Sequence, residues 1–124
     1  TQLARRLTGL EVIATASRPE TAQWVRELGA HEVIDHTRPL GDELRRINAQ
    51  APNYVVSLTH TAQHYAAIAQ AIAPQGKFGL IDDPEAGVVA VELLKGKSVS
   101  LHWEFMFTRS TFATSDMIAQ HNLL

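Results

Sequence analysis

Residues 12–35 read VIATASRPETAQWVRELGAHEVID, two short apolar runs separated by a segment with helical periodicity. The first run, 12–16, has the continuous apolar character of a strand covered on both faces in a parallel sheet. The middle segment carries a capping residue, Ser17, with Pro and Glu in the first helical turn, and it ends at Gly29. The second run, 32–35, is again a short strand. The stretch therefore predicts one complete strand–helix–strand unit.

The rest of the chain continues this alternation. Strands separated by helices of about 10 to 13 residues favour repeated βαβ units. We expect an α/β fold with a Rossmann-like, doubly wound and mostly parallel sheet and with helices on both faces. The clearest helix has one apolar stripe made of Tyr65, Ile68, Ala69 and Ile72. Helices are expected at 3–7, 40–50, 61–73 and 116–124, strands at 54–58, 78–81 and 98–105, and either state at 88–94.

Composition narrows the class of protein. The 124 residues suffice for one domain with a real core but are few for a two-domain enzyme. A 45% apolar fraction without an apolar run of about 18 residues argues against a membrane protein. A net charge of −2 without a basic cluster argues against nucleic acid as a partner. The absence of cysteine excludes disulfides and cysteine zinc sites in these residues and fits a cytoplasmic location. Because the chain starts on Thr1, already in a helical pattern, we expect it to be part of a longer protein.

Four segments carry a family resemblance through their joint order and spacing. They are 12–18, 27–35, 54–56 and 73–77. Together they resemble the coenzyme domain of the medium-chain dehydrogenase/reductase superfamily, and the similarity covers essentially the whole chain. Segments 104–109 and 116–121 are most similar to the zinc-type alcohol dehydrogenase-like branch, which groups with quinone oxidoreductases.

The resemblance implies an oxidoreductase that transfers hydride from NADPH to a carbonyl, enone or quinone substrate. Residues 1–124 would be a partial NADP-binding (Rossmann) domain of a larger two-domain enzyme, without the first strand and the Gly-rich loop that hold the pyrophosphate. This part alone would be inactive, and substrate selection would belong to the other domain. The alternative is a non-catalytic nucleotide-binding or interaction module of Rossmann type, because this fold serves many functions.

Ser17 and Arg18 stand where a dinucleotide-binding fold contacts the adenosine ribose. An acid there accepts a hydrogen bond from a free 2′-hydroxyl, whereas a small polar residue with Arg suits a 2′-phosphate. We therefore expect NADP(H) as the cofactor, and the missing acid also disfavours a methyltransferase that uses S-adenosylmethionine. The competing interpretation is that Ser17 caps the next helix and Arg18 is merely solvated. By resemblance, His36 reaches the same ribose phosphate from the end of the next strand; otherwise it is an exposed loop histidine.

Thr59, His60 and Ile81 close two later strands. Ligands of open parallel sheets bind outside the carboxyl ends of the strands, so we expect these residues, with Asp82, beside the nicotinamide ribose. Turn formation is the alternative for Thr59 and Asp82. By resemblance, Phe107 approaches the nicotinamide, although a large aromatic residue after a strand is also typical of a core or an interface.

No metal ligand and no catalytic residue is assigned in this chain. His60 and His64 are four residues apart at the start of a helix and could share a metal. No third ligand is evident nearby in the sequence, and the resemblance places a catalytic zinc mainly in the other domain. The spacing of Ser, His and acidic residues suggests no nucleophilic or acid–base group, which fits chemistry in which the cofactor supplies the hydride.

Two expectations concern assembly. By resemblance, the absent first strand would lie between the second and fourth strands of the family, so its two neighbours are left with open edges. We expect these edges to pair directly, to be filled by another chain, or to leave a split and partly disordered domain. The resemblance also implies a homodimer formed through the last strand, which runs from Ser98 to Phe105. A polar edge in solvent is the alternative for that strand.

Overall fold

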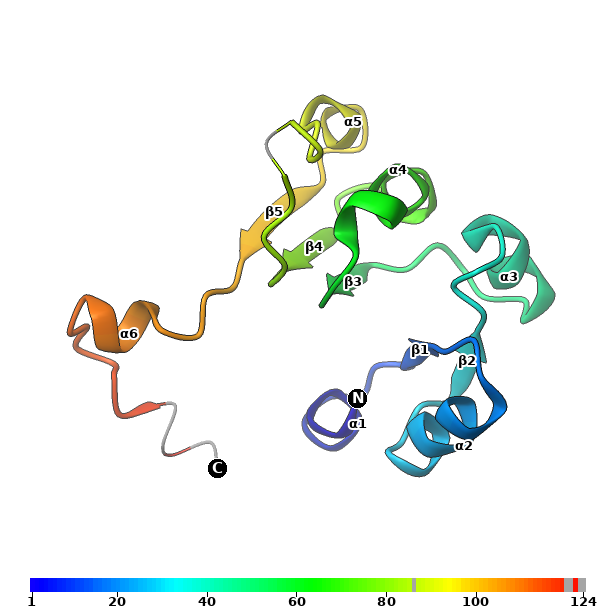
Figure 1. Ribbon diagram of the computed structural model, residues 1–124, viewed down its shortest axis with the longest axis horizontal. Helices are drawn as coiled ribbons and strands as arrows, with labels where there is room; N and C mark the ends of the chain where they lie inside the picture. Colours follow the sequence, from blue (N-terminus) through cyan, green and yellow to red (C-terminus); the bar gives the residue numbers. More distant parts are fainter. Residues whose placement is uncertain (86, 120–121, 123–124) are drawn as a thin grey trace.

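The structure, a computed structural model, describes residues 1–85, 87–119 and 122. It confirms the expected α/β fold, with helices and strands alternating along most of the chain (Figure 1). The elements are, in chain order, α1 (Gln2–Leu7), β1 (Ile13–Thr15), α2 (Pro19–Glu27), β2 (Glu32–Ile34), α3 (Leu40–Arg46), β3 (Tyr54–Ser57), α4 (Thr61–Ala71), β4 (Lys77–Leu80), α5 (Glu92–Lys95), β5 (Ser100–Trp103) and α6 (Thr108–Thr111).

The strands form two separate parallel sheets. β1 pairs with β2 in one sheet, and β3, β4 and β5 lie in that order in the other. Within the described residues no strand joins β1 to β3, and Figure 1 shows the sheets apart, with α3 in the connection between them. Direct pairing of the two open edges, one of the three expected outcomes, is therefore wrong. The sheet is split.

The larger core lies between α4 and the three-stranded sheet. Phe78 and Leu80 of β4 have no exposed surface, and the Tyr65 hydroxyl donates a hydrogen bond to the Ala90 carbonyl at 2.9 Å. Complete burial of one such large side chain contributes about 1.5–3 kcal/mol. The apolar stripe of α4 predicted from the sequence faces this core, and all its members are buried: Tyr65, Ile68, Ala69 and Ile72.

A smaller core supports the two-stranded sheet. It consists of the buried residues Ala16, Ala30 and Val33, against which Ala22 and Val25 of α2 pack. These are mostly small side chains, so this core buries less apolar surface than the larger one. α3 connects the two cores, because its first residue, Leu40, packs against the larger one and Arg46 donates a hydrogen bond to the carbonyl of Val33 in the smaller one.

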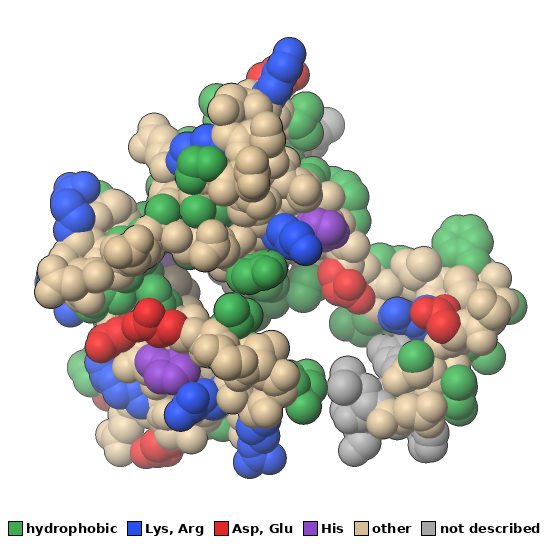
Figure 2. All heavy atoms as spheres, turned by 180° about the vertical axis from the view of Figure 1, so that it is seen from behind, with side chains coloured by type: hydrophobic (Ala, Val, Ile, Leu, Met, Phe, Trp, Pro, Cys, Tyr) green, Lys and Arg blue, Asp and Glu red, His purple; other side chains and the backbone are tan. Residues whose placement is uncertain are grey.

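One face of the three-stranded sheet is exposed. Tyr54 and Val56 of β3 have 54% and 63% of their surface exposed, while Ser57, on the opposite face, is buried. A shallow depression over Val56, Gly79 and His102 marks this face. In the rear view of Figure 2, hydrophobic side chains border the hollow between the upper and lower masses of the molecule.

Several elements are shorter than predicted because non-glycine residues adopt left-handed backbone conformations. The helix expected at 40–50 ends at Arg46, and Asn48 follows with φ 53°. The strand expected at 98–105 starts only at Ser100, since Ser98 has φ 51°, and it ends at Trp103. Helices of 10 to 13 residues were expected; α4 has eleven, but α2 has nine residues and α3 seven.

Two predictions near the C-terminus hold only in part. Segment 88–94 forms no strand, and only its last residues enter α5. α6 was not predicted. Of the helix expected at 116–124, residues 116–118 form a turn, residues 119 and 122 are helical, and 120, 121, 123 and 124 lie outside the described residues. Across the described residues, no helix has the length and apolar character needed to cross a membrane.

Candidate functional site

The register of β1 and β2 places Ser17, Arg18 and His36 at the carboxyl-terminal end of the smaller sheet. β1 and β2 are parallel, with Thr15 opposite Ile34, and the Ala16 N–H continues the pairing by donating to the Ile34 carbonyl at 2.9 Å. Ser17 lies two residues after Thr15, and His36 lies two residues after Ile34. Neighbouring strands lie about 4.8 Å apart, so the chain segments that carry these residues leave the sheet side by side.

Arg18 is exposed at the start of α2 and presents an uncommitted cation. It is the N-cap residue of α2, with extended backbone angles and no side-chain capping bond. The interpretation of Ser17 as the helix cap is therefore wrong. Among the described residues, no hydrogen bond or ion pair engages the Arg18 guanidinium. A guanidinium beside a hydroxyl and an imidazole can bind a phosphate, because it donates two parallel hydrogen bonds to phosphate oxygens.

The turn that carries His36 is fixed by a buried carboxylate that the sequence did not reveal. Glu43 accepts a hydrogen bond from the Asp35 N–H at 2.8 Å and two from Arg46 at 2.9 and 2.8 Å. The bonds from Arg46, followed by the bond from Asp35, lower the pKa of Glu43 from 4.5 to about 2. Asp35 closes the turn by accepting bonds from the Thr37 N–H and hydroxyl, which lower the pKa of Asp35.

The larger sheet places its own predicted residues at its carboxyl ends. Thr59 and His60 follow β3, and Ile81 follows β4, where its N–H donates to the Ser57 carbonyl at 3.1 Å. His60 has φ 54° and forms the N-cap of α4, and the hydroxyl of Thr59 lies 3.0 Å from His60 Nδ1. A left-handed histidine is uncommon and costs of order 1 kcal/mol or more.

Asp82 stabilises the start of α4. Its carboxylate accepts the Thr61 N–H at 2.9 Å, which lowers the pKa of Asp82. In the same turn, the buried hydroxyls of Ser57 and Thr61 lie 2.7 Å apart and share a hydrogen bond. Asp82 thus stabilises the first turn of α4. Its bond to the Thr61 N–H and the contact between the Ser57 and Thr61 hydroxyls together fix the turn between β3 and α4.

A contact between two histidine rings connects the carboxyl-terminal ends of the two sheets. The rings of His36 and His64 lie 6.0 Å apart, edge to face at 76°. Burial, followed by the neighbouring imidazoles of His36 and His60, lowers the pKa of His64. The sequence grouped His64 only with His60, because 28 positions separate it from His36 and no spacing rule connects them. In the described part of the chain, no group of three or more His, Asp or Glu side chains could hold a metal ion.

Phe107 lies away from these residues. It is the N-cap of α6, it is exposed, and its ring contacts that of Phe105 at 5.5 Å. Figure 1 shows α6 beyond the end of β5, apart from both sheets. The structure therefore does not bring Phe107 together with the other predicted site residues.

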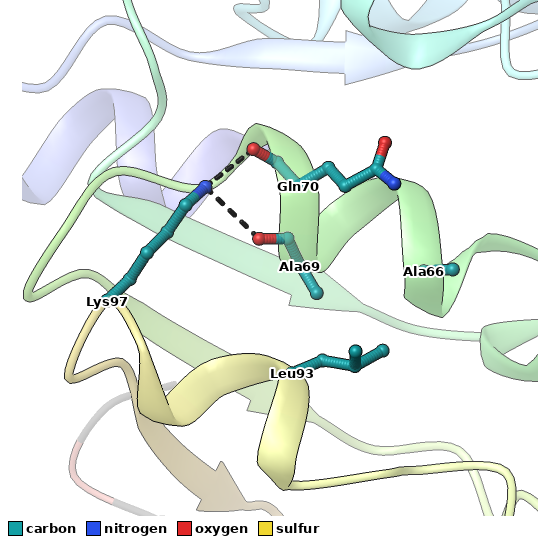
Figure 3. Close-up of a pocket in the computed structure, with 5 residues that line it drawn as sticks. All are labelled: Ala66, Ala69, Gln70, Leu93 and Lys97. Atoms are coloured by element: carbon teal, nitrogen blue, oxygen red, sulfur yellow. Dashed lines mark hydrogen bonds between the residues drawn. The ribbon is translucent and has the colours of Figure 1, made fainter.

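A groove of about 410 Å³ between α4 and α5 lies at the other end of the sheet (Figure 3). Lys97 borders it, and its ammonium donates to the carbonyls of Ala69, Gln70 and Ile72 at 3.2, 2.5 and 2.8 Å. The groove adjoins the C-terminal end of α4 and the approach to β5. Because Lys97, the cation that lines this groove, already binds these carbonyls, the candidate site remains at the carboxyl-terminal ends of the strands.

Comparisons with known proteins identify the family of the chain. Residues 1–120 match the family described as zinc-binding dehydrogenase. A zinc-type alcohol dehydrogenase-like protein of Staphylococcus aureus strain Mu50 is 34% identical over 100% of this chain and 36% of its own length. A solved protein of zinc-dependent alcohol dehydrogenase type from Rhizobium etli CFN 42 is 56% identical, with a TM-score of 0.94 over 99% of this chain and 36% of that one.

A more distant structure shares the fold alone. It is a short chain alcohol dehydrogenase from E. coli CFT073, complexed with NADH. It is 14% identical and has a TM-score of 0.74 over 96% of this chain and 36% of its own. The chain thus spans about a third of the length of each of these proteins.

Proposed function

The chain belongs to the zinc-binding dehydrogenase family, and from this premise we propose that it is the coenzyme-binding part of an NADPH-dependent oxidoreductase. The family is one of oxidoreductases. In the proposal, the complete protein is a two-domain, cytoplasmic enzyme that reduces a carbonyl, enone or quinone substrate. Residues 1–124 supply most of its Rossmann domain, and the preceding chain supplies the first strand, the Gly-rich loop and the substrate domain.

The single observation that supports NADPH is the uncommitted Arg18 beside Ser17 at the end of β1. A carboxylate at this place would repel a 2′-phosphate, whereas a guanidinium attracts it. Asp35, the acid that follows β2, is occupied by its own turn, where it accepts two bonds from Thr37 and lies 3.6 Å from Arg38. His36 adds a third polar group at the same edge.

The remaining proposed contacts follow the carboxyl ends of the larger sheet. Thr59, His60 and Ile81 would line the nicotinamide ribose, since ligands of parallel sheets bind at this edge. Phe107 would approach the nicotinamide only if α6 folds toward the sheets in the complete protein. The cofactor supplies the hydride, and the residues of this chain hold and orient it.

Fluorescence of Trp24 and Trp103 can test the cofactor. Trp24 lies on α2, the helix that Arg18 begins, and Trp103 ends β5, so both report on the carboxyl edges. In the complete protein we expect NADPH to bind about ten-fold or more tightly than NADH, and 2′-phospho-ADP-ribose to compete. Ten-fold corresponds to roughly 1.4 kcal/mol, just below the range of about 1.5–3 kcal/mol for one hydrogen bond to a charged group.

Variants sharpen the test. Arg18→Gln should abolish the preference, and Ser17→Asp should shift it toward NADH, because a carboxylate favours a free ribose hydroxyl. Arg26→Gln is the matched control: it removes an exposed arginine from the other end of α2 and should change neither affinity. Equal affinities for the two coenzymes in the unmodified protein would contradict NADPH as the cofactor.

A further inference from the structure

The open face of the three-stranded sheet carries an apolar groove. Strand register aligns Val56, Gly79 and His102 in one row across β3, β4 and β5, and it pairs Tyr54 with Lys77 in an earlier row. All five residues line a shallow depression of about 210 Å³. Gly79 forms its floor, because a Cβ there would meet its nearest neighbour, a methyl group of Val56, only at 3.6 Å. The groove therefore has room for side chains that belong to another element.

A parallel sheet normally has helices on both faces. Sheets whose strands are all parallel occur almost only where both faces are covered, because their crossover connections are helical. β3, β4 and β5 are all parallel, and α4 packs on the face that carries Phe78 and Leu80. On the opposite face, more than half of the surface of Tyr54 and Val56 is exposed. This face therefore lacks its layer of helix.

Lys77 favours one direction for the missing helix. It begins β4, its ammonium lies 5.9 Å from the centre of the Tyr54 ring, and among the described residues no ion pair engages it. The C-terminus of a helix carries partial negative charge and attracts cations. A helix that runs antiparallel to the strands, as crossover helices do, would place its C-terminus at this amino-terminal end of the sheet, beside Lys77.

The same direction indicates which part of the protein forms this helix. The first strand proposed above must run parallel to β1 and β3, so it starts at the end of the sheet where an antiparallel helix would stop. A short turn can connect the two. α1 has no buried residue, and α6 lies beyond the end of β5, apart from both sheets (Figure 1). The chain spans 36% of the length of its Staphylococcus aureus relative, which leaves ample sequence for a further helix.

We propose that the open face of β3, β4 and β5 is the docking site of an amphipathic helix from the chain before Thr1, the helix that directly precedes the proposed first strand. This inference rests on the part of the proposed function in which a longer chain precedes residue 1. Strands of four residues extend about 13 Å, so about nine residues of helix suffice to cross the face. Their apolar stripe packs on Tyr54 and Val56, and their C-terminus lies beside Lys77.

Thiol labelling of the complete protein tests whether the face is covered. Residues 1–124 contain no cysteine, so Val56→Cys places one reporter in the middle of the groove. We expect a maleimide to modify it about 100-fold or more slowly than Arg26→Cys, an exposed control on α2, because labelling then requires local opening. Mass spectrometry of the two peptides measures the rates. Equal rates would overturn the proposal.

A photocrosslinker identifies the occupant. With p-benzoylphenylalanine in place of Tyr54, irradiation of the complete protein should link this position to a peptide that precedes Thr1. A link to residues 1–124 of a second copy, a link to the segment after β5, or the absence of any link would overturn the proposal.

A charge reversal tests the direction of the helix. In the Val56→Cys background, Lys77→Glu should raise the labelling rate about five-fold, because a carboxylate repels the helix C-terminus. Lys95→Glu, on α5, is the matched control and should leave the rate unchanged. Equal rates in the two variants would contradict the proposed orientation.

None of these readouts requires a coenzyme, so the two proposals fail separately. Slow labelling at residue 56 in a protein without preference for NADPH would overturn the cofactor proposed above and support the docked helix. Rapid labelling in a protein that prefers NADPH would do the reverse.

Discussion

Glu43 shows how a single side chain positions the candidate site. Its carboxylate is buried, with 3% of the residue exposed, yet both oxygens are satisfied by Arg46 and by the Asp35 N–H. Arg46 also donates to the Val33 carbonyl at 3.2 Å, which connects α3 to β2. A buried charge is tolerated only when it is paired and hydrogen bonded. The turn with His36 thus depends on a residue seven positions further along the chain.

Glu43→Gln should destabilise the chain and flatten its pH dependence. The pKa of Glu43 falls from 4.5 to about 2 on folding, so this carboxylate stabilises the native state above pH 4.5. That contribution is lost as pH falls from about 4.5 through about 2. Urea unfolding at pH 7, 4 and 2.5 should show a lower midpoint for Glu43→Gln at pH 7 and a smaller decline toward acid. Glu11→Gln, an exposed control, should follow the unmodified protein; a Glu43→Gln midpoint equal to it at pH 7 would contradict the assigned role.

The sequence indicated where most candidate site residues lie, but not which side chains contact them. Ser17, Arg18 and His36 could be located because residues after parallel strands share one edge, which follows from chain direction alone. Glu43 and His64 could not be found, because their contacts depend on how α3 and α4 pack. Ser17 was also a candidate helix cap, yet the helix begins after Arg18 instead. The binding roles of all these residues remain proposals.

The side chain of Lys97, a residue outside α4, caps the C-terminal end of that helix. Three carbonyls at the C-terminal end of this helix accept bonds from the Lys97 ammonium: those of Ala69 and Gln70, which Figure 3 shows, and that of Ile72. The last carbonyls of a helix lack partners within the helix and carry partial negative charge. A lysine from the loop before β5 therefore both satisfies them and connects α4 to the next strand.

Lys97→Met should lower the free energy of unfolding by about 1.5–3 kcal/mol, the range for hydrogen bonds to a charged group. Methionine keeps much of the aliphatic volume but cannot donate, so the three carbonyls lose their partner. Thermal or urea unfolding followed by far-UV circular dichroism measures the change. Lys95→Met, an exposed lysine two residues earlier, should leave stability almost unchanged. Equal losses in the two variants would show that the cap contributes nothing specific.

Element type was more predictable than element length. The apolar stripe of α4 and the short apolar runs of β1 to β4 were visible because periodicity records burial. The ends were not, because Asn48, Ser98 and Ala113 adopt left-handed conformations that their identities only weakly signal. α5 and α6 have four residues each, too few for a periodic pattern. Gly29 is the contrasting case, since a glycine with φ 101° ends α2 where the sequence predicted.

At the scale of the whole molecule, the split sheet leaves apolar surface uncovered. β1 and β3 each have an edge that, among the described strands, pairs with nothing, and Tyr54 and Val56 are exposed beside it. The resemblance allowed this outcome because it placed a strand of the preceding chain between them. In the proposed larger enzyme, this strand would fill the open edges of β1 and β3.

β5 offers a test of the proposed homodimer, because it ends the larger sheet and, within the described residues, has a partner only in β4. The N–H groups of Ser100 and Glu104 donate to Gly76 and Leu80 at 3.0 and 2.9 Å, so the alternate N–H of Trp103 points outward. In the complete protein, Trp103→Pro removes that donor and should convert the dimer to monomer if the β5 edges pair. Trp103→Ala removes the same side chain but keeps the N–H, and it should remain dimeric. Sedimentation velocity distinguishes them: a dimeric Trp103→Pro variant, or a monomeric unmodified protein, would exclude pairing through this edge.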